Sequence, residues 1–244
     1  KYWDLYEDCA HLEPEVPAMD YADHDPHSQR IFDANNWRDF NITNEDIRRS
    51  RRAYFANISY LDDKIGEMLD ALEATRQEAV ILFVSDHGDM LGERGLWFKM
   101  SFLEGSSRVP MMISAQGIEP RLVTDAVSNI DVCPTLCDLA GISMEEVMPW
   151  TQGESLVGLA KGGKRTTPVA MEYAAEASQA PMVALVQDGW KYTRCALDPE
   201  QLFNLRRDPH ELNNLAQDPD AAEQLEKMRA EADTRWDLER FDAD

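Results

Sequence analysis

The sequence contains no run of about 18 consecutive apolar residues, so no membrane-spanning helix is expected. It also shows no internal repeat, no low-complexity stretch and no signal-peptide pattern at its first residues. Cysteine is scarce, and the 4 cysteines show no spacing that is typical of metal ligands. So few cysteines are typical of proteins in a reducing compartment, and the sequence therefore favours a cytoplasmic location.

Basic residues are also few. Lysine and arginine number 24 against 46 aspartates and glutamates, which leaves a formal net charge of −22. Nucleic acids and anionic membrane surfaces attract basic proteins, so the sequence indicates neither of them as a partner. The charge is compatible with a cationic or zwitterionic small-molecule substrate. With 244 residues, 43% of them hydrophobic, the chain is long enough to bury the core of an ordinary globular protein.

The first part of the chain alternates between helical and strand-like patterns. Residues 1–43 carry several prolines and no sustained period, which predicts irregular structure. From Asn44 to about Thr75, apolar residues recur at steps of three and four, which predicts one amphipathic helix. Four further elements are expected: a buried strand over 80–85, a second strand over 109–114, a short strand or extended link over 123–128, and a short helix over 129–140.

The pattern changes after a linker rich in glycine and lysine at 158–164. Asp188-Gly189 between two apolar runs is typical of a β-hairpin turn. Short strands are expected at 169–173, 182–187, 190–194 and 201–205, before a final helix over 220–241. The sequence thus predicts an α/β layer over residues 1–163 and a small α+β subdomain with an antiparallel sheet over 164–244. Because the first residue is Lys1 and not Met, we expect the chain to be part of a longer protein.

The most informative stretch follows the strand at 80–85. There an apolar run ends in Asp86, His87 and Gly88, with Glu93 and Lys99 a few residues further on. In α/β proteins, ligands bind beyond the carboxyl ends of the strands, so this loop is a candidate metal site. The alternative is a solvated turn that Asp86 caps. Elsewhere, Cys133 and Cys137 are one helical turn apart, which favours a small buried face.

Five segments carry a resemblance to a known family. Residues 84–99 resemble the metal-and-substrate segment of sulfatases, which belong to the alkaline phosphatase superfamily. The remaining segments fit the same family in the same order: 54–66, 108–111, 129–136 and 202–215. The resemblance implies a sheet sandwiched by helices, present here in part, and hydrolysis of a sulfate ester. Residues 25–30, 97–99 and 171–176 make choline sulfatases the most similar members, which implies choline sulfate as a substrate.

The resemblance also implies roles for individual residues. Asp86 and His87 correspond to metal ligands, and Lys99 to the lysine that binds a sulfate oxygen and assists protonation of the leaving group. The implied ion is Ca²⁺, with Mn²⁺ or Mg²⁺ as alternatives because imidazole is a softer ligand than oxygen. Glu93 is expected to hold the loop in place. Arg94, where many relatives carry histidine, is assigned no role.

Other candidates follow from the implied choline group. Quaternary ammonium ions bind to aromatic faces and carboxylates, so Glu172, Tyr173 and Glu176 are candidates for substrate binding, with a solvated strand end as the alternative. Two histidines and an aspartate lie close together early in the sequence: His24, Asp25 and His27. They are expected to form a surface loop, and the alternative is that they line the entrance of the pocket. Trp236 and Phe241 are expected to pack on the domain or on a neighbouring subunit.

One requirement of the family is missing. Sulfatases carry a C/S-x-P-x-R motif whose Cys or Ser is oxidised to formylglycine, and this motif does not occur around any cysteine or serine here. The nucleophile is therefore expected outside this chain, which corresponds to the C-terminal part of such an enzyme. The isolated chain is expected to be inactive, and the full-length form to be a homo-oligomer. The alternatives are a phosphonate monoester or phosphodiester hydrolase of the same superfamily, and a non-catalytic binding or assembly module.

Overall fold

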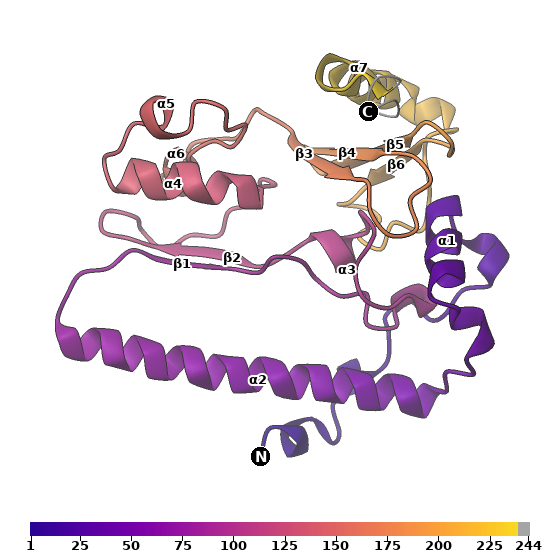
Figure 1. The fold of residues 1–244 in the computed structure, drawn as a ribbon, viewed down its shortest axis with the longest axis horizontal. Helices are drawn as coiled ribbons and strands as arrows, with labels where there is room; N and C mark the ends of the chain where they lie inside the picture. The colour runs from indigo at the N-terminus through magenta and orange to yellow at the C-terminus, as the bar shows by residue number, and fades with distance from the viewer. Residues whose placement is uncertain (239–244) are drawn as a thin grey trace. The chain divides into compact units, whose positions relative to one another are not determined.

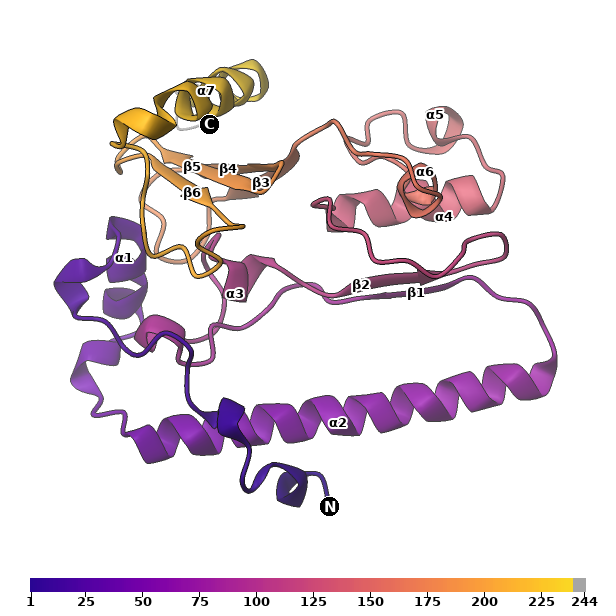
Figure 2. The same cartoon turned by 180° about the vertical axis from the view of Figure 1, so that it is seen from behind.

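The computed structural model describes residues 1–238. They divide into two compact units, whose helices and strands are labelled in Figures 1 and 2. The first unit comprises Lys1–Ala79 and Gly88–Lys99, and the second comprises Val80–His87 and the chain from Met100 onward. Among the described residues, no helix combines the length and the apolar character that crossing a bilayer requires. The predicted boundary at 163/164 falls inside the second unit, between helix α6 and strand β3, and stays a prediction.

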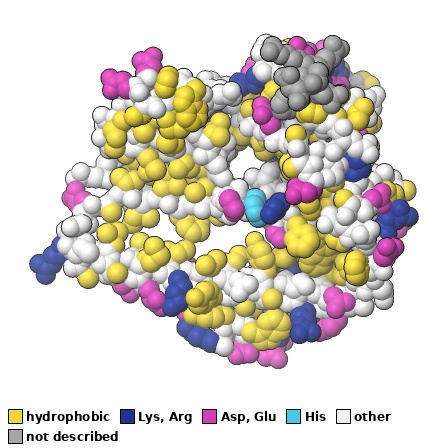
Figure 3. Space-filling view, viewed as in Figure 1, with side chains coloured by type: hydrophobic (Ala, Val, Ile, Leu, Met, Phe, Trp, Pro, Cys, Tyr) yellow, Lys and Arg dark blue, Asp and Glu magenta, His cyan; other side chains and the backbone are white. Residues whose placement is uncertain are grey.

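The first unit is built on the predicted long helix, α2, which spans Asn44–Thr75. A capping box starts it: the amide of Asp46 donates to Thr43 Oγ1 at 3.2 Å, and the amide of Thr43 donates to Asp46 Oδ2 at 2.9 Å. The helix ends at Arg76, which adopts a left-handed conformation with φ of 55°. Its apolar stripe is largely exposed, with Ile58, Leu61 and Met68 at 50%, 55% and 71% exposure (Figure 3).

Residues 1–43 are more ordered than predicted. They contain four short 3₁₀ turns and a helix, α1, at Pro26–Ala34. The sequence does hold the starting signal for this helix: Asp25 is the N-cap and accepts a hydrogen bond from the amide of Ser28 at 3.0 Å, and Pro26 occupies the first turn. The prediction of irregular structure was wrong for this segment because a helix of 9 residues is too short to show a sustained apolar period.

The second unit begins with the two predicted strands. β1 (Ile81–Val84) and β2 (Met111–Ser114) pair antiparallel, and β1 is half-buried rather than buried as predicted, since this sheet has two strands. Residues 123–128 form an extended link. The expected short helix is α4 (Val132–Leu139), which follows a 3₁₀ turn at Asn129–Asp131 and lies beside the β1–β2 pair in Figures 1 and 2. Three shorter helices complete this part: α3 (Glu104–Ser107), α5 (Met144–Val147) and α6 (Val157–Ala160).

A four-stranded antiparallel sheet follows, in the order β3-β4-β5-β6. Its strands are β3 (Val169–Tyr173), β4 (Met182–Gln187), β5 (Trp190–Cys195) and β6 (Gln201–Asn204). The predicted hairpin turn is confirmed: Asp188 and Gly189 have φ of 54° and 83°, as a two-residue type I′ turn requires.

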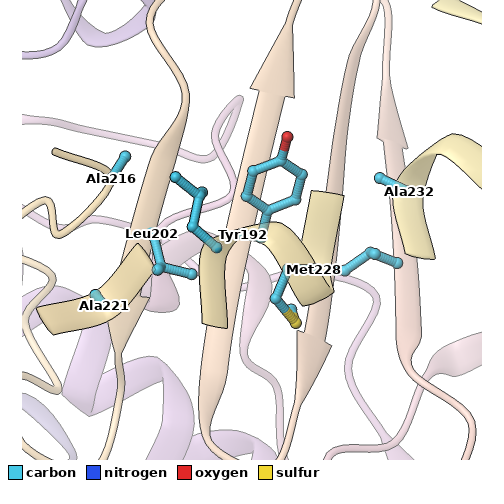
Figure 4. Close-up of a cluster of buried hydrophobic side chains, with 8 residues drawn as sticks. Tyr192, Leu202, Ala216, Ala221, Met228 and Ala232 are labelled. Carbon is cyan, nitrogen blue, oxygen red and sulfur yellow. The ribbon is translucent and has the colours of Figure 1, made fainter. Parts of the chain in front are cut away.

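Helix α7 (Ala222–Arg235) covers one face of this sheet. The core between them is fully buried at Tyr192 and Leu202 on the strands and at Met228 on the helix (Figure 4). The final helix was predicted to run over 220–241, but it ends at Trp236, whose backbone is extended. Phe241 lies outside the described residues.

Two glycines of the second unit give opposite predictions for substitution by alanine. A Cβ on Gly153 would overlap the carbonyl group of Ile130, whose carbon would lie 2.6 Å away, whereas a Cβ on Gly158 in α6 would meet nothing within 4 Å. We expect Gly153→Ala to lower the free energy of unfolding by about 3 kcal/mol, because backbone cannot move aside as a flexible side chain can. Gly158→Ala is the matched control and is expected to be neutral or stabilising by up to about 1 kcal/mol. Urea denaturation of both variants measures the difference, and equal stabilities would contradict the prediction.

Candidate metal and substrate site

The loop after β1 carries the candidate metal ligands of the second unit. Asp86 and His87 are exposed, with 83% and 44% of their side chains accessible. The amide of His87 donates to Asp86 Oδ1 at 2.9 Å, and Ser85 Oγ donates to the His87 carbonyl at 2.9 Å. The bond from the His87 amide lowers the pKa of Asp86 below its ordinary value. The loop therefore presents an ionised carboxylate next to an imidazole.

Asn129, from a distant part of the chain, makes hydrogen bonds to the backbone of this loop. Its side-chain amide donates to the carbonyls of Ser85 at 3.0 Å and Asp86 at 3.3 Å. Asn129 starts the 3₁₀ turn before α4, and a buried ion pair holds that turn: Asp131 is fully buried and accepts from Arg165 Nη1 at 2.5 Å. The sequence placed Asn129 at a helix start and gave it no role in the site, because a hydrogen bond over 43 residues or more leaves no local signal.

The donors of this loop fit a divalent ion. Asp86 Oδ2 and His87 Nε2 are 3.5 Å apart, a separation that lets both atoms lie about 2.0–2.6 Å from one common ion. Two donors do not complete a coordination sphere, and among the described residues no group of three His, Cys, Asp or Glu could hold a metal ion. Asp86 and His87 can thus supply part of a metal site.

In the first unit, Glu93 organises the loop that carries Lys99. Its carboxylate accepts hydrogen bonds from the amides of Glu15 at 3.1 Å and Val16 at 2.8 Å, and from Arg51 Nη1 at 3.0 Å. Arg51 is buried and also donates to the carbonyl of Leu91 at 3.0 Å. These contacts confirm the prediction that Glu93 holds the loop in place.

The same loop is strained. Three of its residues other than glycine have positive φ: Leu91, Arg94 and Phe98, at 50°, 59° and 63°. Such conformations persist only where surrounding contacts impose them, and they gather at functional sites. Here the amide of Met90 donates to the Phe98 carbonyl at 2.6 Å, and Asp89 accepts from the amide of Phe98 at 3.2 Å. The exposed Lys99 follows directly after this closed loop.

The three residues with the strongest family resemblance fall in different units. Lys99 belongs to the first unit, and Asp86 and His87 belong to the second. Each unit shows its own part of the site, and a common role for the three side chains stays a prediction.

The structure separates the residues proposed to bind an ammonium group. Glu172 and Tyr173 are neighbours on β3, so their side chains point to opposite faces of the sheet. Glu172 Oε1 accepts from Trp236 Nε1 at 2.6 Å, whereas Tyr173 donates to the carbonyl of Glu176 at 2.9 Å. Burial and the charge of Glu176 raise the pKa of Tyr173 to about 12. Tyr173 and Glu176 thus form one group and Glu172 another, and the part that each takes in substrate binding stays a prediction.

Trp236 also packs against the core between α7 and the sheet, which confirms that it packs on the domain.

The early histidines correct a prediction. His24 and His27 were expected on a surface loop, but they are 6% and 3% exposed. His24 lies against Phe32 with ring centroids 4.9 Å apart, and His27 is in the first turn of α1. Both are therefore core residues of the first unit.

Burial of His24 makes stability depend on pH. Burial lowers the pKa of His24 below its ordinary value of 6.5, outweighing the opposing charges of Asp25 and Asp23, while Arg94 lowers it further. Because the pKa of His24 is lower in the folded protein than in the unfolded chain, the contribution of neutral His24 to stability is complete at a pH above the unfolded pKa. That contribution is lost as the pH falls through the folded pKa. We expect His24→Phe to unfold less readily than the wild type as the pH falls from about 7 to about 5. Thermal melts across that range measure the slope; the exposed His11→Gln is the control, and an unchanged slope in His24→Phe would refute the prediction.

Comparisons with known proteins identify the family and the fold. The family model described as Sulfatase matches residues 17–142, and the model described as N-sulphoglucosamine sulphohydrolase, C-terminal, matches residues 92–236. A choline-sulfatase of Rhizobium meliloti (strain 1021) is 60% identical over 248 residues, covering the whole of this chain and 48% of that protein. The chain thus spans about half the length of this curated relative.

Two solved structures show the same fold. A 2-O GAG sulfatase aligns with a TM-score of 0.72 and 25% identity over 91% of this chain and 51% of its own. The phosphonate monoester hydrolase of Agrobacterium radiobacter aligns with a TM-score of 0.64 and 27% identity over 78% of this chain and 43% of its own. The predicted α/β fold with an antiparallel C-terminal sheet is confirmed. Two family models that each cover more than half of the sequence, and a relative identical at three positions in five, place the chain in the sulfatase family.

Proposed function

We propose that this chain forms part of a sulfuric-ester hydrolase that cleaves choline sulfate to choline and sulfate. The observation that carries the proposal is the pair of Asp86 and His87, an ionised carboxylate and an imidazole 3.5 Å apart on one exposed loop after a strand. The choline-sulfatase of Rhizobium meliloti, 60% identical over the whole chain, supports the choice of substrate.

In this proposal Asp86 and His87 would hold a divalent ion, with Ca²⁺ first and Mn²⁺ or Mg²⁺ as alternatives. A bound ion would neutralise the negative charge that develops on the sulfuryl oxygens. The hydrogen bonds from Asn129 keep the backbone of the Asp86 loop in place while the ligands bind. The Asp86–His87 turn is closed by its own hydrogen bonds, so its two donors need little reorganisation.

Lys99 would bind the anionic end of the substrate. Its ammonium group offers three donors, which suits a sulfate oxygen and the oxygen of the departing alcohol. The strained loop before Lys99, closed by Asp89 and braced by Glu93, would limit the positions that its backbone can take. Tyr173, Glu176 and Glu172 are the candidates for contact with the ammonium end.

The remaining parts of the enzyme would come from outside these 244 residues. Sulfatases use a formylglycine nucleophile, and no motif for it occurs in this chain. We propose that the nucleophile and the other metal ligands precede this chain in a longer protein, and that the chain alone is inactive. A homo-oligomer and a cytoplasmic location belong to the same proposal.

A second candidate is a phosphonate monoester or phosphodiester hydrolase. The observation that favours it is the likeness to the phosphonate monoester hydrolase of Agrobacterium radiobacter, at 27% identity and a TM-score of 0.64. Both substrates are tetrahedral anions that a divalent ion could hold, so the metal ligands alone do not distinguish the two reactions. A non-catalytic binding module is the third candidate. A C/S-x-P-x-R motif in the reading frame upstream of this chain would decide for an enzyme.

The test is a comparison of substrates with the full-length protein. We expect sulfate release from choline sulfate to exceed hydrolysis of a phosphonate monoester by at least about a hundredfold in kcat/KM, because an enzyme binds the transition state of its own substrate best. A preference for the phosphonate would select the second candidate.

Treatment with EDTA should abolish the activity, and dialysis against Ca²⁺ or Mn²⁺ should restore it. Full activity after the metal is removed would contradict the role of Asp86 and His87.

A further inference from the structure

Three sulfur atoms gather at one end of the second unit, away from any role in the proposed reaction. Cys133 and Cys137 lie on α4, and Met148 follows directly after α5. Cys133 Sγ is 3.3 Å from Met148 Sδ. The sequence favoured a small buried face for the two cysteines, but the structure shows Cys133 exposed and Cys137 half-buried. A ligand in solution can therefore reach this cluster.

Hydrogen bonds hold the backbone that carries the three sulfur-containing side chains. Cys133 and Cys137 are four residues apart on one helix, so their side chains share a face. The turn after α4 is closed by bonds from the amide of Ile142 to the Cys137 carbonyl at 2.8 Å and from Gly141 to Asp138 at 3.1 Å. The amide of Met148 donates to the Met144 carbonyl at 2.8 Å, which fixes the backbone of Met148 at the end of α5.

The two thiols lie close enough to influence each other. Burial raises the pKa of Cys137, and the neighbouring thiol of Cys133 adds to this effect. A cation bound between the two sulfurs would offset the effect of the neighbouring thiol on Cys137. Two thiolates and one thioether form a soft donor set, which selects monovalent copper over Ca²⁺ or Mg²⁺.

We propose that Cys133, Cys137 and Met148 form a binding site for Cu(I). The two cysteines bind as thiolates and the methionine as a neutral thioether, so binding of one ion releases two protons and leaves the oxidation state of copper and sulfur unchanged. Because protons and Cu(I) compete for the thiolates, the apparent affinity rises with pH. The site differs in chemistry from Asp86 and His87, whose carboxylate and imidazole suit a harder divalent ion.

The experiment is an anaerobic titration of the full-length protein with Cu(I), in competition with the chromophoric chelator bicinchoninate. We expect one equivalent to bind tightly. Cys133→Ser and Cys137→Ser should each weaken binding by about a hundredfold or more, and Met148→Leu by about tenfold, because each removes one soft donor from a three-donor site. Circular dichroism of each variant confirms that it is folded, so a loss of binding reports on the site itself.

Two matched controls test the specificity of the effect. Met144→Leu removes a thioether from the other end of α5, and Cys9→Ser removes a thiol of the first unit; both should bind Cu(I) as the wild type does. The proposal is overturned if the folded Cys133→Ser or Cys137→Ser variant retains the wild-type affinity, or if Met144→Leu weakens binding as much as Met148→Leu. It is also overturned if Zn²⁺ displaces Cu(I) at equal concentration, since a harder donor set would then be present.

Discussion

Replacing Asp86 by alanine in the full-length protein is expected to lower kcat/KM for choline sulfate by about a thousandfold or more, because in the proposed function the metal ion would lose a charged ligand. The side chain of Asp86 is 83% exposed and lies beyond the end of β1, so its removal should leave the fold intact. Metal content measured after dialysis should fall together with activity. Thermal melting of the metal-free proteins should show no difference between the variant and the wild type.

Asp86→Asn sharpens this prediction. The asparagine side chain can still accept the hydrogen bond that the amide of His87 donates to Asp86, so the turn is kept while the charge is lost. We expect this variant to bind metal nearly as poorly as Asp86→Ala. The control is Glu78→Ala, which removes an exposed carboxylate shortly before β1. Near-normal turnover by either Asp86 variant would remove Asp86 from the site.

The second large effect is expected at Lys191, a lysine that is only 1% exposed. Its ammonium group lies 2.6 Å from Glu104 Oε1 and 2.9 Å from Glu211 Oε1, and it donates to the carbonyl of Phe102 at 2.6 Å. Glu211 also accepts a hydrogen bond from the amide of Glu104 at 2.7 Å. This cluster ties β5 to the segment around α3 and to the loop after β6.

We expect Lys191→Met to lower the free energy of unfolding by about 3–5 kcal/mol, because it leaves the buried carboxylate of Glu211 and the half-buried one of Glu104 without their cation. Burial already raises the pKa of Glu211, and the Lys191 ammonium opposes that rise. The double variant Lys191→Met/Glu211→Gln should recover part of the lost free energy of unfolding, since it also removes the buried negative charge of Glu211. Denaturant unfolding measures each variant.

The control for this series is Lys227→Met, on the exposed side of α7. It should change stability by less than about 0.5 kcal/mol, as is usual at exposed positions. If Lys191→Met lowers the free energy of unfolding no more than Lys227→Met does, the cluster around Lys191 does not stabilise the fold. A double variant less stable than Lys191→Met would show that stranded charge is not the cause.

Local signals predicted the elements whose formation depends on neighbouring residues. The apolar period of α2 and its capping box at Thr43 lie within one segment, and so does the Asp188-Gly189 turn, which needs two residues of positive φ. The short helix α1 was missed because its only clear signals are the N-cap at Asp25 and the proline that follows it. The apolar stripe of α2 was predicted, but its exposure could not be read from the sequence, because a period says which residues share a face and not what covers them.

The candidate site divides in the same way. Asp86 and His87 are adjacent in sequence, so their geometry could be anticipated from the strand that precedes them. Asn129 could not be assigned, since its bond to the loop depends on how α4 packs beside β1. Glu172 and Tyr173 were grouped by proximity in the sequence, whereas the alternation of side chains along β3 sends them to different partners.

By itself, the sequence determined the family of this protein, the positions of its long helix and hairpin, and the loop that carries the candidate acidic and imidazole ligands. These features depend on short-range backbone preferences and on motifs of adjacent residues. Only the tertiary structure decided that His24 and His27 are buried, that Lys191 lies between two glutamates, and that three sulfur atoms meet between α4 and α5. Each of these results depends on contacts between segments that are distant along the chain or on packing around a turn, where the free energy comes from burial and charge pairing and not from the local sequence.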